Sequence, residues 1–252
     1  MESGSLVKAF ALLESLAGRG GQGPLGDLTL GVGLRKPTAH RILQSLIALG
    51  YVQRQSGGVY RLTPKLRWLA MNRSDRRLAA VAEPVLRKLR AETGETVNLG
   101  ILRRNRVCYI TVLESSHPLR RVVQPNQSDP VFTTALGRVL AAHLPAAQRE
   151  RLLCAAPVER RTPKTVTDVS NLRRILVKIQ QDGHAVERDQ TDLGVTCIAA
   201  AVVVRGEPIA AISLSIPTAR VSADAEGSGI AAVRASAVSL SRLMIHPRRL
   251  SA

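Results

Sequence analysis

One group of polar side chains has the types and spacing to recognise duplex DNA. Lys36, His40, Arg41 and Gln44 recur so that one face of a helix would carry all four. The opposite face of that helix is an apolar stripe of Ala39, Ile42, Leu43 and Leu46. Basic and amide side chains on an exposed helix can contact phosphates and base edges in the major groove. The alternative is a solvated helix face without a partner, and the surrounding elements decide between the two.

A second group of small polar side chains could line a ligand pocket. Two β-prone segments, 197–204 and 208–216, are separated by a three-residue turn. If Val204 pairs with Pro208, counting along both strands puts two cross-strand pairs on one face of the sheet, Cys197 with Ser215 and Ala199 with Ser213. Small polar groups that converge among alanines are typical of a pocket floor. Alternatively, Cys197 is a small buried hydrophobe and the serines are hydrogen-bonded locally.

The same residues give little support for catalysis or metal binding. Cys197 could act as a nucleophile with His143 or His184 as its base, but no local motif indicates such a pair. The three cysteines lack C-x-x-C spacing and the histidines are scattered, so neither a disulfide framework nor a zinc site is indicated. We therefore expect a protein that is not an enzyme and has no cofactor and no metal site.

The first helix-forming segments suggest a helix-turn-helix. An apolar stripe predicts a helix over 5–17, and the Gly-rich run 18–24 ends it. A short helix with two leucines inward would follow, closed by Gly33 in left-handed backbone. Pro37 would start the next helix, because its missing N–H is not needed in the first turn. In this arrangement the second helix of the motif enters the major groove.

A β-hairpin is predicted directly after this motif. Residues 50–54 and 59–62 are β-prone and flank a turn that contains two glycines. The hairpin would form the wing of a winged helix-turn-helix, with Arg54 and Arg61 available to the DNA backbone. The adjacent wing argues against a merely solvated face on the preceding helix.

The rest of the chain mixes helices and strands. Residues 66–80 suggest a linker helix with an apolar patch of Trp68, Leu69 and Met71, and a separate helix would span 82–93. The remaining predicted strands are 96–102, 107–113, 197–204 and 208–216, and the remaining predicted helices are 134–144, 168–181 and 222–245. Thr133 or Thr134 would cap the helix at 134, whose free N–H groups attract an anion. This order predicts an α+β domain with a largely antiparallel sheet.

Composition favours a polyanionic partner, and charge alone does not decide between DNA and an anionic membrane surface. The 252-residue chain carries a net charge of +17, and residues 1–70 are the denser in charge, with nine Lys and Arg against three Asp and Glu. Aromatic residues make up only 2%, whereas binders of single strands and RNA stack bases on them. No apolar run approaches the roughly 20 residues of a membrane span, and the N-terminus lacks a signal-peptide pattern. We expect a cytoplasmic protein without a membrane partner.

The chain resembles the IclR-type transcriptional regulators over nearly its whole length. The resemblance rests on Gly33–Leu43 and Gly50–Leu66, and later on Thr134–Gly137, Leu193–Ala199 and Ala211–Ser215. It implies three parts: a winged helix-turn-helix DNA-binding domain at 1–65, a linker helix at 66–80, and a mixed α/β, GAF-like domain at 81–252 that binds an effector and forms oligomers.

The resemblance also implies which residues meet DNA and effector. Lys36, Thr38, His40 and Arg41 match positions that face DNA in that family, and our candidate DNA contacts further include Pro37, Gln44, Arg54 and Arg61. The effector, often a small organic carboxylate, would be met by the backbone N–H groups of Thr134, Ala135 and Leu136 and by the side chains of Glu187, Cys197, Ser213 and Ser215. Glu187 and Leu193 depart from the family pattern, which leaves the identity of the ligand open.

These observations predict a sequence-specific transcriptional regulator. Its affinity for a near-palindromic operator would be modulated by a small organic acid, and it would act as a homodimer or a dimer of dimers. The alternative is a nonspecific, architectural DNA-binding protein whose C-terminal domain only forms oligomers. Base contacts would distinguish the two, because phosphate contacts give no sequence preference.

Overall fold

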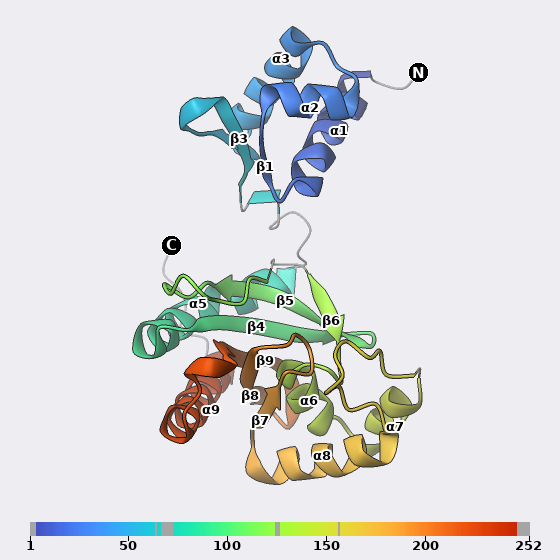
Figure 1. Cartoon of the computed structure of the whole chain (residues 1–252), viewed down its shortest axis with the longest axis vertical. Coiled ribbons are helices and arrows are strands. Elements are labelled where there is room, and N and C mark those ends of the chain that lie inside the picture. The colour runs from blue at the N-terminus through green and yellow to red at the C-terminus, as the bar shows by residue number, and fades with distance from the viewer. Residues whose placement is uncertain (1–3, 64, 67–72, 124–126, 156, 246–252) are drawn as a thin grey trace. The chain divides into compact units, whose positions relative to one another are not determined.

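The structure is a computed structural model that describes residues 4–63, 65–66, 73–123, 127–155 and 157–245. The chain divides into two compact units, residues 1–73 and 74–252 (Figure 1). Each unit has its own apolar core, and each is described by itself.

Three helices and a small sheet form the N-terminal unit. The helices are α1 (Gly4–Gly18), α2 (Leu25–Val32) and α3 (Lys36–Ala48), and the strands are β1 (Gln22–Pro24), β2 (Val52–Arg54) and β3 (Val59–Leu62). The apolar stripe predicted for α3 is buried at all four positions and packs against leucines of α1 and α2. Gly33 ends α2 with a φ of 67°, the left-handed backbone that the sequence predicts. The predicted winged helix-turn-helix is confirmed.

One strand of the N-terminal sheet is not evident from the sequence. The Gly-rich run 18–24 ends α1 as expected, but its last three residues also form β1, which pairs with β3 in the order β1-β3-β2. Gly20 and Gly21, with φ of 71° and 88°, turn the chain into this strand. A strand of Gln, Gly and Pro has no alternating apolar pattern, so only its backbone pairing defines it.

A six-stranded antiparallel sheet organises the C-terminal unit. Its order is β6-β5-β4-β9-β8-β7, and every neighbouring pair is antiparallel. The strands are β4 (Thr96–Arg103), β5 (Arg106–Leu113), β6 (Ser128–Pro130), β7 (Ala185–Arg188), β8 (Val195–Val204) and β9 (Glu207–Pro217). The predicted α+β architecture is confirmed. The edge strands β6 and β7 escaped prediction, because three or four residues are too few for a strand pattern.

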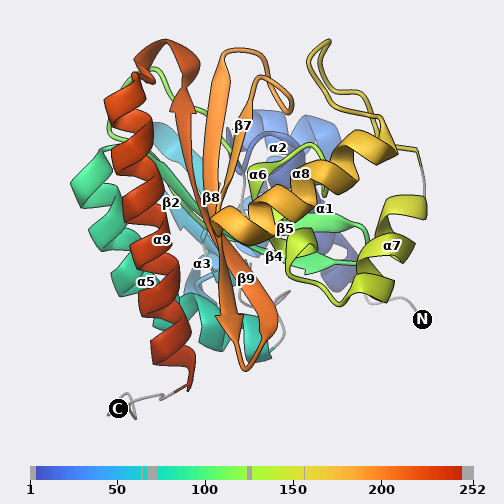
Figure 2. The ribbon, with the colours of Figure 1, turned by 90° about the horizontal axis from the view of Figure 1, so that it is seen from below.

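Helices cover both faces of this sheet (Figure 2). The helices are α5 (Arg73–Thr93), α6 (Ala135–Ala142), α7 (Ala146–Cys154), α8 (Val169–Asp182) and α9 (Ala223–Ile245). On one face, α9 packs against β8 and β9, with Gly229 close to the side chains of Ile198 and Leu214. On the other face, α6 shares a core with Cys197 and Ala199, and α8 packs against α6. The first turn of α6 therefore meets the centre of the sheet.

Helix α5 differs from the predicted arrangement. Two helices were expected, one ending near residue 80 and one beginning at 82, whereas a single helix runs from Arg73 to Thr93 through Pro84. Leu78, Ala82, Leu86 and Leu89 are all buried at helical spacing on both sides of the expected break. Burial of this continuous stripe offsets the backbone hydrogen bond that Pro84 cannot make. The predicted apolar patch of Trp68, Leu69 and Met71 lies outside the described residues.

The strand pairing behind the predicted pocket floor is correct, although its starting assumption is wrong. Cys197 pairs with Ser215 and Ala199 with Ser213, as counted. At the turn, however, Pro208 pairs with Val203 rather than Val204, and a bulge between Val202 and Val203 absorbs the difference. The turn itself is the two-residue Arg205-Gly206, with φ of 52° and 83°, which suits a tight hairpin.

Candidate DNA-reading face and effector cavity

Most of the predicted DNA-reading residues lie on the outer side of α3. Lys36, Pro37, Arg41 and Gln44 are exposed, and Thr38 and His40 are half-buried. The side chains of His40 and Gln44 lie one helical turn apart, with their Nε2 atoms 3.4 Å from each other. The structure therefore brings six of the eight candidate DNA contacts onto one helix.

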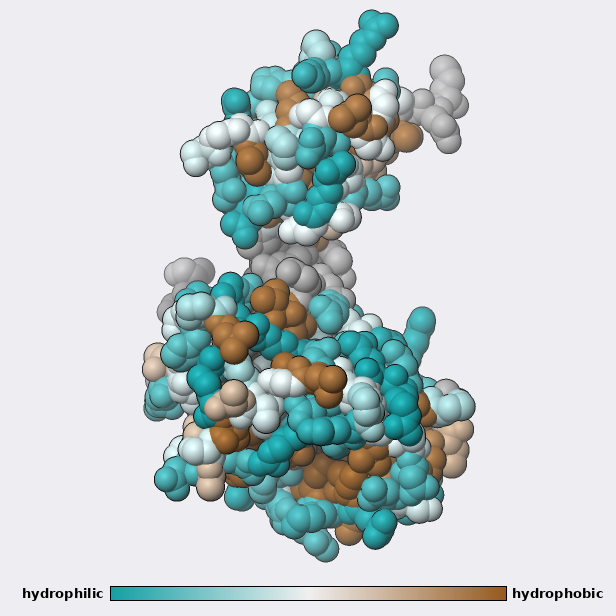
Figure 3. Space-filling view, viewed as in Figure 1, coloured by the Kyte–Doolittle hydropathy of each residue, from teal (hydrophilic) through white to brown (hydrophobic). Residues whose placement is uncertain are grey.

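The other two candidates, Arg54 and Arg61, are exposed in the wing. The guanidinium carbon of Arg54 lies 5.9 Å from the centre of the ring of Tyr60, which is buried. Such a contact positions the arginine and leaves its N–H groups free to donate to a phosphate. Hydrophilic residues cover much of the visible face of the N-terminal unit (Figure 3).

In the C-terminal unit, most of the predicted effector residues gather around one small cavity. Six of them line it: Thr134, Ala135, Leu136, Cys197, Ser213 and Ser215. Tyr109, Arg121 and Thr191 complete the lining. The cavity measures about 10 Å³, room for about one water molecule. A ligand larger than water must therefore move part of this lining.

The first turn of α6 supplies backbone donors to the cavity. Thr134 caps the helix, and its hydroxyl accepts a hydrogen bond from the N–H of Gly137 at 3.0 Å. The N–H groups of Ala135 and Leu136 have no acceptor within the helix, because first-turn N–H groups point out of the helix end. The partial positive charge at this end favours a carboxylate.

Strands β8 and β9 supply a polar floor. The Sγ of Cys197 lies 3.4 Å from the Oγ of Ser215. Nδ2 of Asn98, on β4, donates to the Oγ atoms of Ser213 and Ser215 at 3.3 and 3.1 Å. Among the described residues, Oδ1 of Asn98 is a buried polar atom without a hydrogen-bond partner. An acceptor thus remains available beside the two serines.

The surroundings of Cys197 do not activate its thiol. Burial raises the pKa of Cys197 to about 12, so the thiol is protonated near neutral pH and is a poor nucleophile. Nδ1 of His143 lies 2.8 Å from the carbonyl oxygen of Val139, and Nδ1 of His184 lies 3.1 Å from that of Asp182. These contacts tie both histidines to their own chain segments. The arrangement gives no support to the nucleophile hypothesis.

Glu187 is buried, but its carboxylate is occupied by the loop that follows β7. It accepts hydrogen bonds from the backbone N–H groups of Gln190 and Thr191 and lies 3.3 Å from the Thr191 hydroxyl. Burial raises the pKa of the Glu187 carboxyl, and the backbone hydrogen bonds oppose this shift. Glu187 thus positions Thr191 at the cavity. A direct contact between Glu187 and the effector stays a prediction.

Arg121 lines the cavity and was not found from the sequence. Its side chain is only 7% exposed, with Nε 2.7 Å from Asp192 and Nη2 3.1 Å from Asp129. Nη1 lies 3.3 Å from the Tyr109 hydroxyl, which donates to Asp129 at 2.8 Å. The neighbouring Arg120 instead pairs with a glutamate at the surface. Two adjacent arginines in a coil segment carry no periodicity that would indicate which one turns inward.

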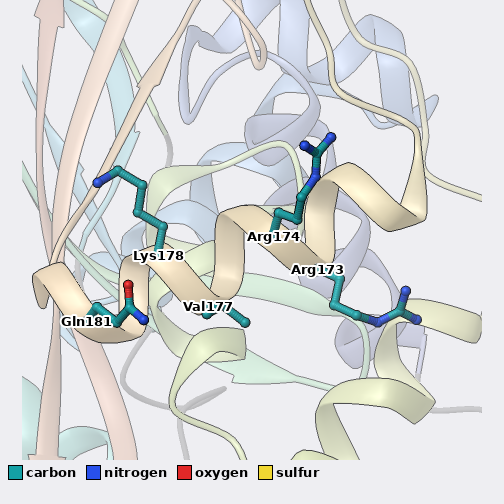
Figure 4. Close-up of a pocket in the computed structure, with 5 residues that line it drawn as sticks. All are labelled: Arg173, Arg174, Val177, Lys178 and Gln181. Carbon is teal, nitrogen blue, oxygen red and sulfur yellow. The ribbon is translucent and has the colours of Figure 1, made fainter.

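A second hollow lies on the outer surface of α8 (Figure 4). Its lining residues all come from this one helix, namely Arg173, Arg174, Val177, Lys178 and Gln181. Arg173 is paired with Glu150, and Lys178 with Asp182. Polar groups from different elements do not converge here, so we assign the hollow no ligand.

The described residues contain no group of three His, Cys, Asp or Glu side chains that could hold a metal ion. Cys108, Cys154 and Cys197 are free thiols. No helix in the described part of the chain is long and apolar enough to cross a membrane.

Two family models match the chain. One, described as the IclR helix-turn-helix domain, matches residues 5–56, and the other, described as the bacterial transcriptional regulator IclR C-terminal domain, matches residues 72–242. Among curated relatives, the probable transcriptional regulator SauR of Cupriavidus necator is 33% identical over 221 residues. The match covers 86% of this chain and 88% of the relative.

Solved structures agree with these matches. The IclR of Thermotoga maritima superimposes with a TM-score of 0.78 at 23% identity, over 96% of this chain and 99% of that chain, which shows the fold. An IclR homologue from Microbacterium hydrocarbonoxydans, complexed with 4-hydroxybenzoate, gives a TM-score of 0.69 at 25% identity. That match covers 97% of this chain and all of the other.

Proposed function

Because the chain belongs to the IclR family of bacterial transcriptional regulators, we propose that it binds a near-palindromic operator as a homodimer or a dimer of dimers. The protein is a DNA-binding transcriptional regulator with an N-terminal helix-turn-helix and a C-terminal effector-binding domain. Two half-sites one helical turn apart would match the symmetry of a dimer. We propose that the DNA-binding domain spans residues 1–65, the linker residues 66–80, and the effector-binding and oligomerisation domain residues 81–252.

On the DNA side, we assign base reading to α3 and backbone contacts to the wing. Arg41 and Gln44 are exposed about one and two turns beyond the start of α3, on the helix whose side chains would meet base edges. Arg54 and Arg61 are exposed on the two wing strands and would meet phosphates. This division of contacts favours a sequence-specific regulator over an architectural DNA-binding protein.

On the ligand side, the observation that carries the proposal is the convergence of the α6 first turn with Cys197, Ser213 and Ser215 on one cavity. First-turn N–H groups suit a carboxylate, so the effector class is a small organic acid. The 4-hydroxybenzoate in the relative from Microbacterium hydrocarbonoxydans is an acid of this kind. For such an acid to regulate DNA binding, its affinity must differ between the DNA-competent and the DNA-incompetent state.

The test is a selection of genomic DNA fragments by the purified protein at about 0.15 M salt, where nonspecific binding is already weak. We expect enrichment of a short near-palindrome, and a change in its recovery when small organic acids are added. Uniform recovery of all fragments would contradict sequence-specific regulation and favour the architectural alternative. If none of the acids changes the recovery of the palindrome, the assigned effector class is contradicted.

A further inference from the structure

Arg121 places a positive charge in the effector cavity. Among the described lining residues it alone carries a charge, and the first turn of α6 lines the same cavity. The cavity is small, so even a short molecule that enlarges it on binding can span its lining. Such a molecule can touch both the guanidinium of Arg121 and the N–H groups of Ala135 and Leu136. The cavity thus offers two anion-binding groups to one ligand.

Of the two carboxylates on Arg121, that of Asp192 is the one that can be displaced. The side chain of Asp129 is 2% exposed and also accepts the Tyr109 hydroxyl, so it is fixed from two sides. The side chain of Asp192 is 41% exposed and lies in the loop next to Thr191, another lining residue. A ligand that opens the cavity can therefore separate Asp192 from Arg121 and leave Asp192 in water.

The charges around Arg121 make this exchange selective. Arg161 lies 3.9 Å from Asp129 and 3.6 Å from Asp192, so two arginines face two aspartates. Glu159 also lies 3.9 Å from Arg161, but its side chain is 56% exposed and stands in water. Loss of Asp192 from this group leaves Arg121 buried with one carboxylate, which is unfavourable in a site shielded from water. A second carboxylate on the ligand restores the balance, whereas an uncharged ligand tail does not.

We propose that the effector is a short dicarboxylate, with one carboxylate on the α6 first turn and the other in place of Asp192 on Arg121. This inference rests on the proposed function of the cavity as the effector site. It makes Arg121 the residue that determines specificity, because the α6 amides alone accept any small carboxylate.

The test compares acids of equal chain length on the full chain by titration calorimetry. Succinate is compared with butyrate, and malonate with propionate. We expect each dicarboxylate to bind at least about tenfold more tightly than its monocarboxylate partner, because charge-assisted hydrogen bonds to Arg121 form only with the second carboxylate. Equal affinities would overturn the inference and leave the cavity as an effector site for monocarboxylates.

An Asp192→Asn variant tests the exchange directly. It removes the competing carboxylate from Arg121, so succinate should bind about tenfold more tightly than to the native chain, with butyrate unchanged within about twofold. Asp224→Asn makes the same chemical change at an exposed position in α9 and should alter neither acid. Unchanged or weaker succinate binding by Asp192→Asn would overturn the exchange.

An Arg121→Lys variant tests specificity while it keeps the buried charge. The ratio of succinate to butyrate affinity should fall at least about fivefold, because lysine cannot donate from a planar fork. A purely structural role for Arg121 would lower both affinities alike and would contradict the proposal. If none of the four acids binds the native chain or Asp192→Asn, the inference is overturned, and the genomic selection with a wider set of acids still decides the proposed function.

Discussion

Arg41 and Cys197 show how surroundings decide what a side chain can do. Arg41 is exposed on α3, where its guanidinium can reach another molecule. Cys197 is 7% exposed beneath the first turn of α6, where its thiol is shielded from water. The first residue is therefore suited to recognition of a large partner, and the second only to contact with a small ligand that enters the cavity.

We expect Arg41→Ala to weaken operator binding by roughly 10- to 100-fold, the effect of losing a bidentate contact to a base. The operator for this measurement is the fragment enriched in the genomic selection, and affinity is measured by fluorescence anisotropy. Lys8→Ala removes the same charge from an exposed position of α1 and serves as the control. An operator affinity that is the same for Arg41→Ala and the native chain would refute the assigned role.

The buried thiol predicts a difference in alkylation between two cysteines. With a pKa raised to about 12, Cys197 is almost entirely protonated at pH 8, and the thiolate is the reactive form. Iodoacetamide at pH 8 should therefore modify the exposed Cys154 at least about a hundredfold faster than Cys197, as measured by peptide mass spectrometry. Both should react alike in guanidinium chloride. Rapid labelling of Cys197 in the native chain would instead revive the nucleophile hypothesis.

The sequence identifies the cavity residues only where a local pattern exists. Ser213 and Ser215 are found because strand alternation and hairpin counting place them opposite Ala199 and Cys197. Arg121 and Thr191 come from connecting segments, whose course is set by tertiary contacts rather than by a repeat. Glu187 is named as an effector contact by resemblance, but its carboxylate is directed to the following loop by backbone N–H groups that no sequence pattern reveals.

At the scale of elements, α6 depends on a close approach of two backbone segments. Gly137 lies in the first turn of α6, and an added Cβ would stand 2.0 Å from the carbonyl oxygen of Val131. The chain from Val131 to Thr134 therefore passes against the helix at a distance that only glycine permits. This contact holds the first-turn N–H groups at the cavity.

We expect Gly137→Ala to destabilise the C-terminal unit by about 3 kcal/mol or more, because backbone atoms rather than flexible side chains would have to move. Gly227→Ala is the matched change at an exposed position of α9, where a Cβ meets nothing within 4 Å. It should stabilise the protein by up to about 1 kcal/mol through higher helix propensity. Urea unfolding of both variants measures the difference, and equal midpoints would contradict the close approach.

Elements whose apolar pattern repeats over many residues are predicted well, and elements of three or four residues are not. The stripes of α3 and α8 and the hairpins of β4 with β5 and β8 with β9 appear at nearly their predicted positions. The strands β1, β6 and β7 have three or four residues and are defined by backbone pairing with a longer or better-patterned strand rather than by a pattern of their own. The predicted break before Ala82 is wrong because the apolar stripe of α5 is buried on both sides of it.

At the scale of the whole molecule, the net charge of +17 raises the question of whether affinity for DNA comes from the overall charge or from placed contacts. Each phosphate contact releases counterions, so the slope of log affinity against log salt counts the contacts that form. A diffuse charge affects encounter and solubility more than this slope. Two arginines in different units allow the two contributions to be separated.

We expect Arg61→Ala to reduce the salt slope of DNA binding by about one unit, because it removes one contact to a phosphate. Arg174→Ala, on the exposed side of α8, lowers the net charge by the same amount and should leave the slope unchanged. Affinities for a fixed duplex between 50 and about 300 mM salt give both slopes. If the two variants lose slope equally, overall charge rather than the wing drives binding, and the contact assigned to Arg61 must be abandoned.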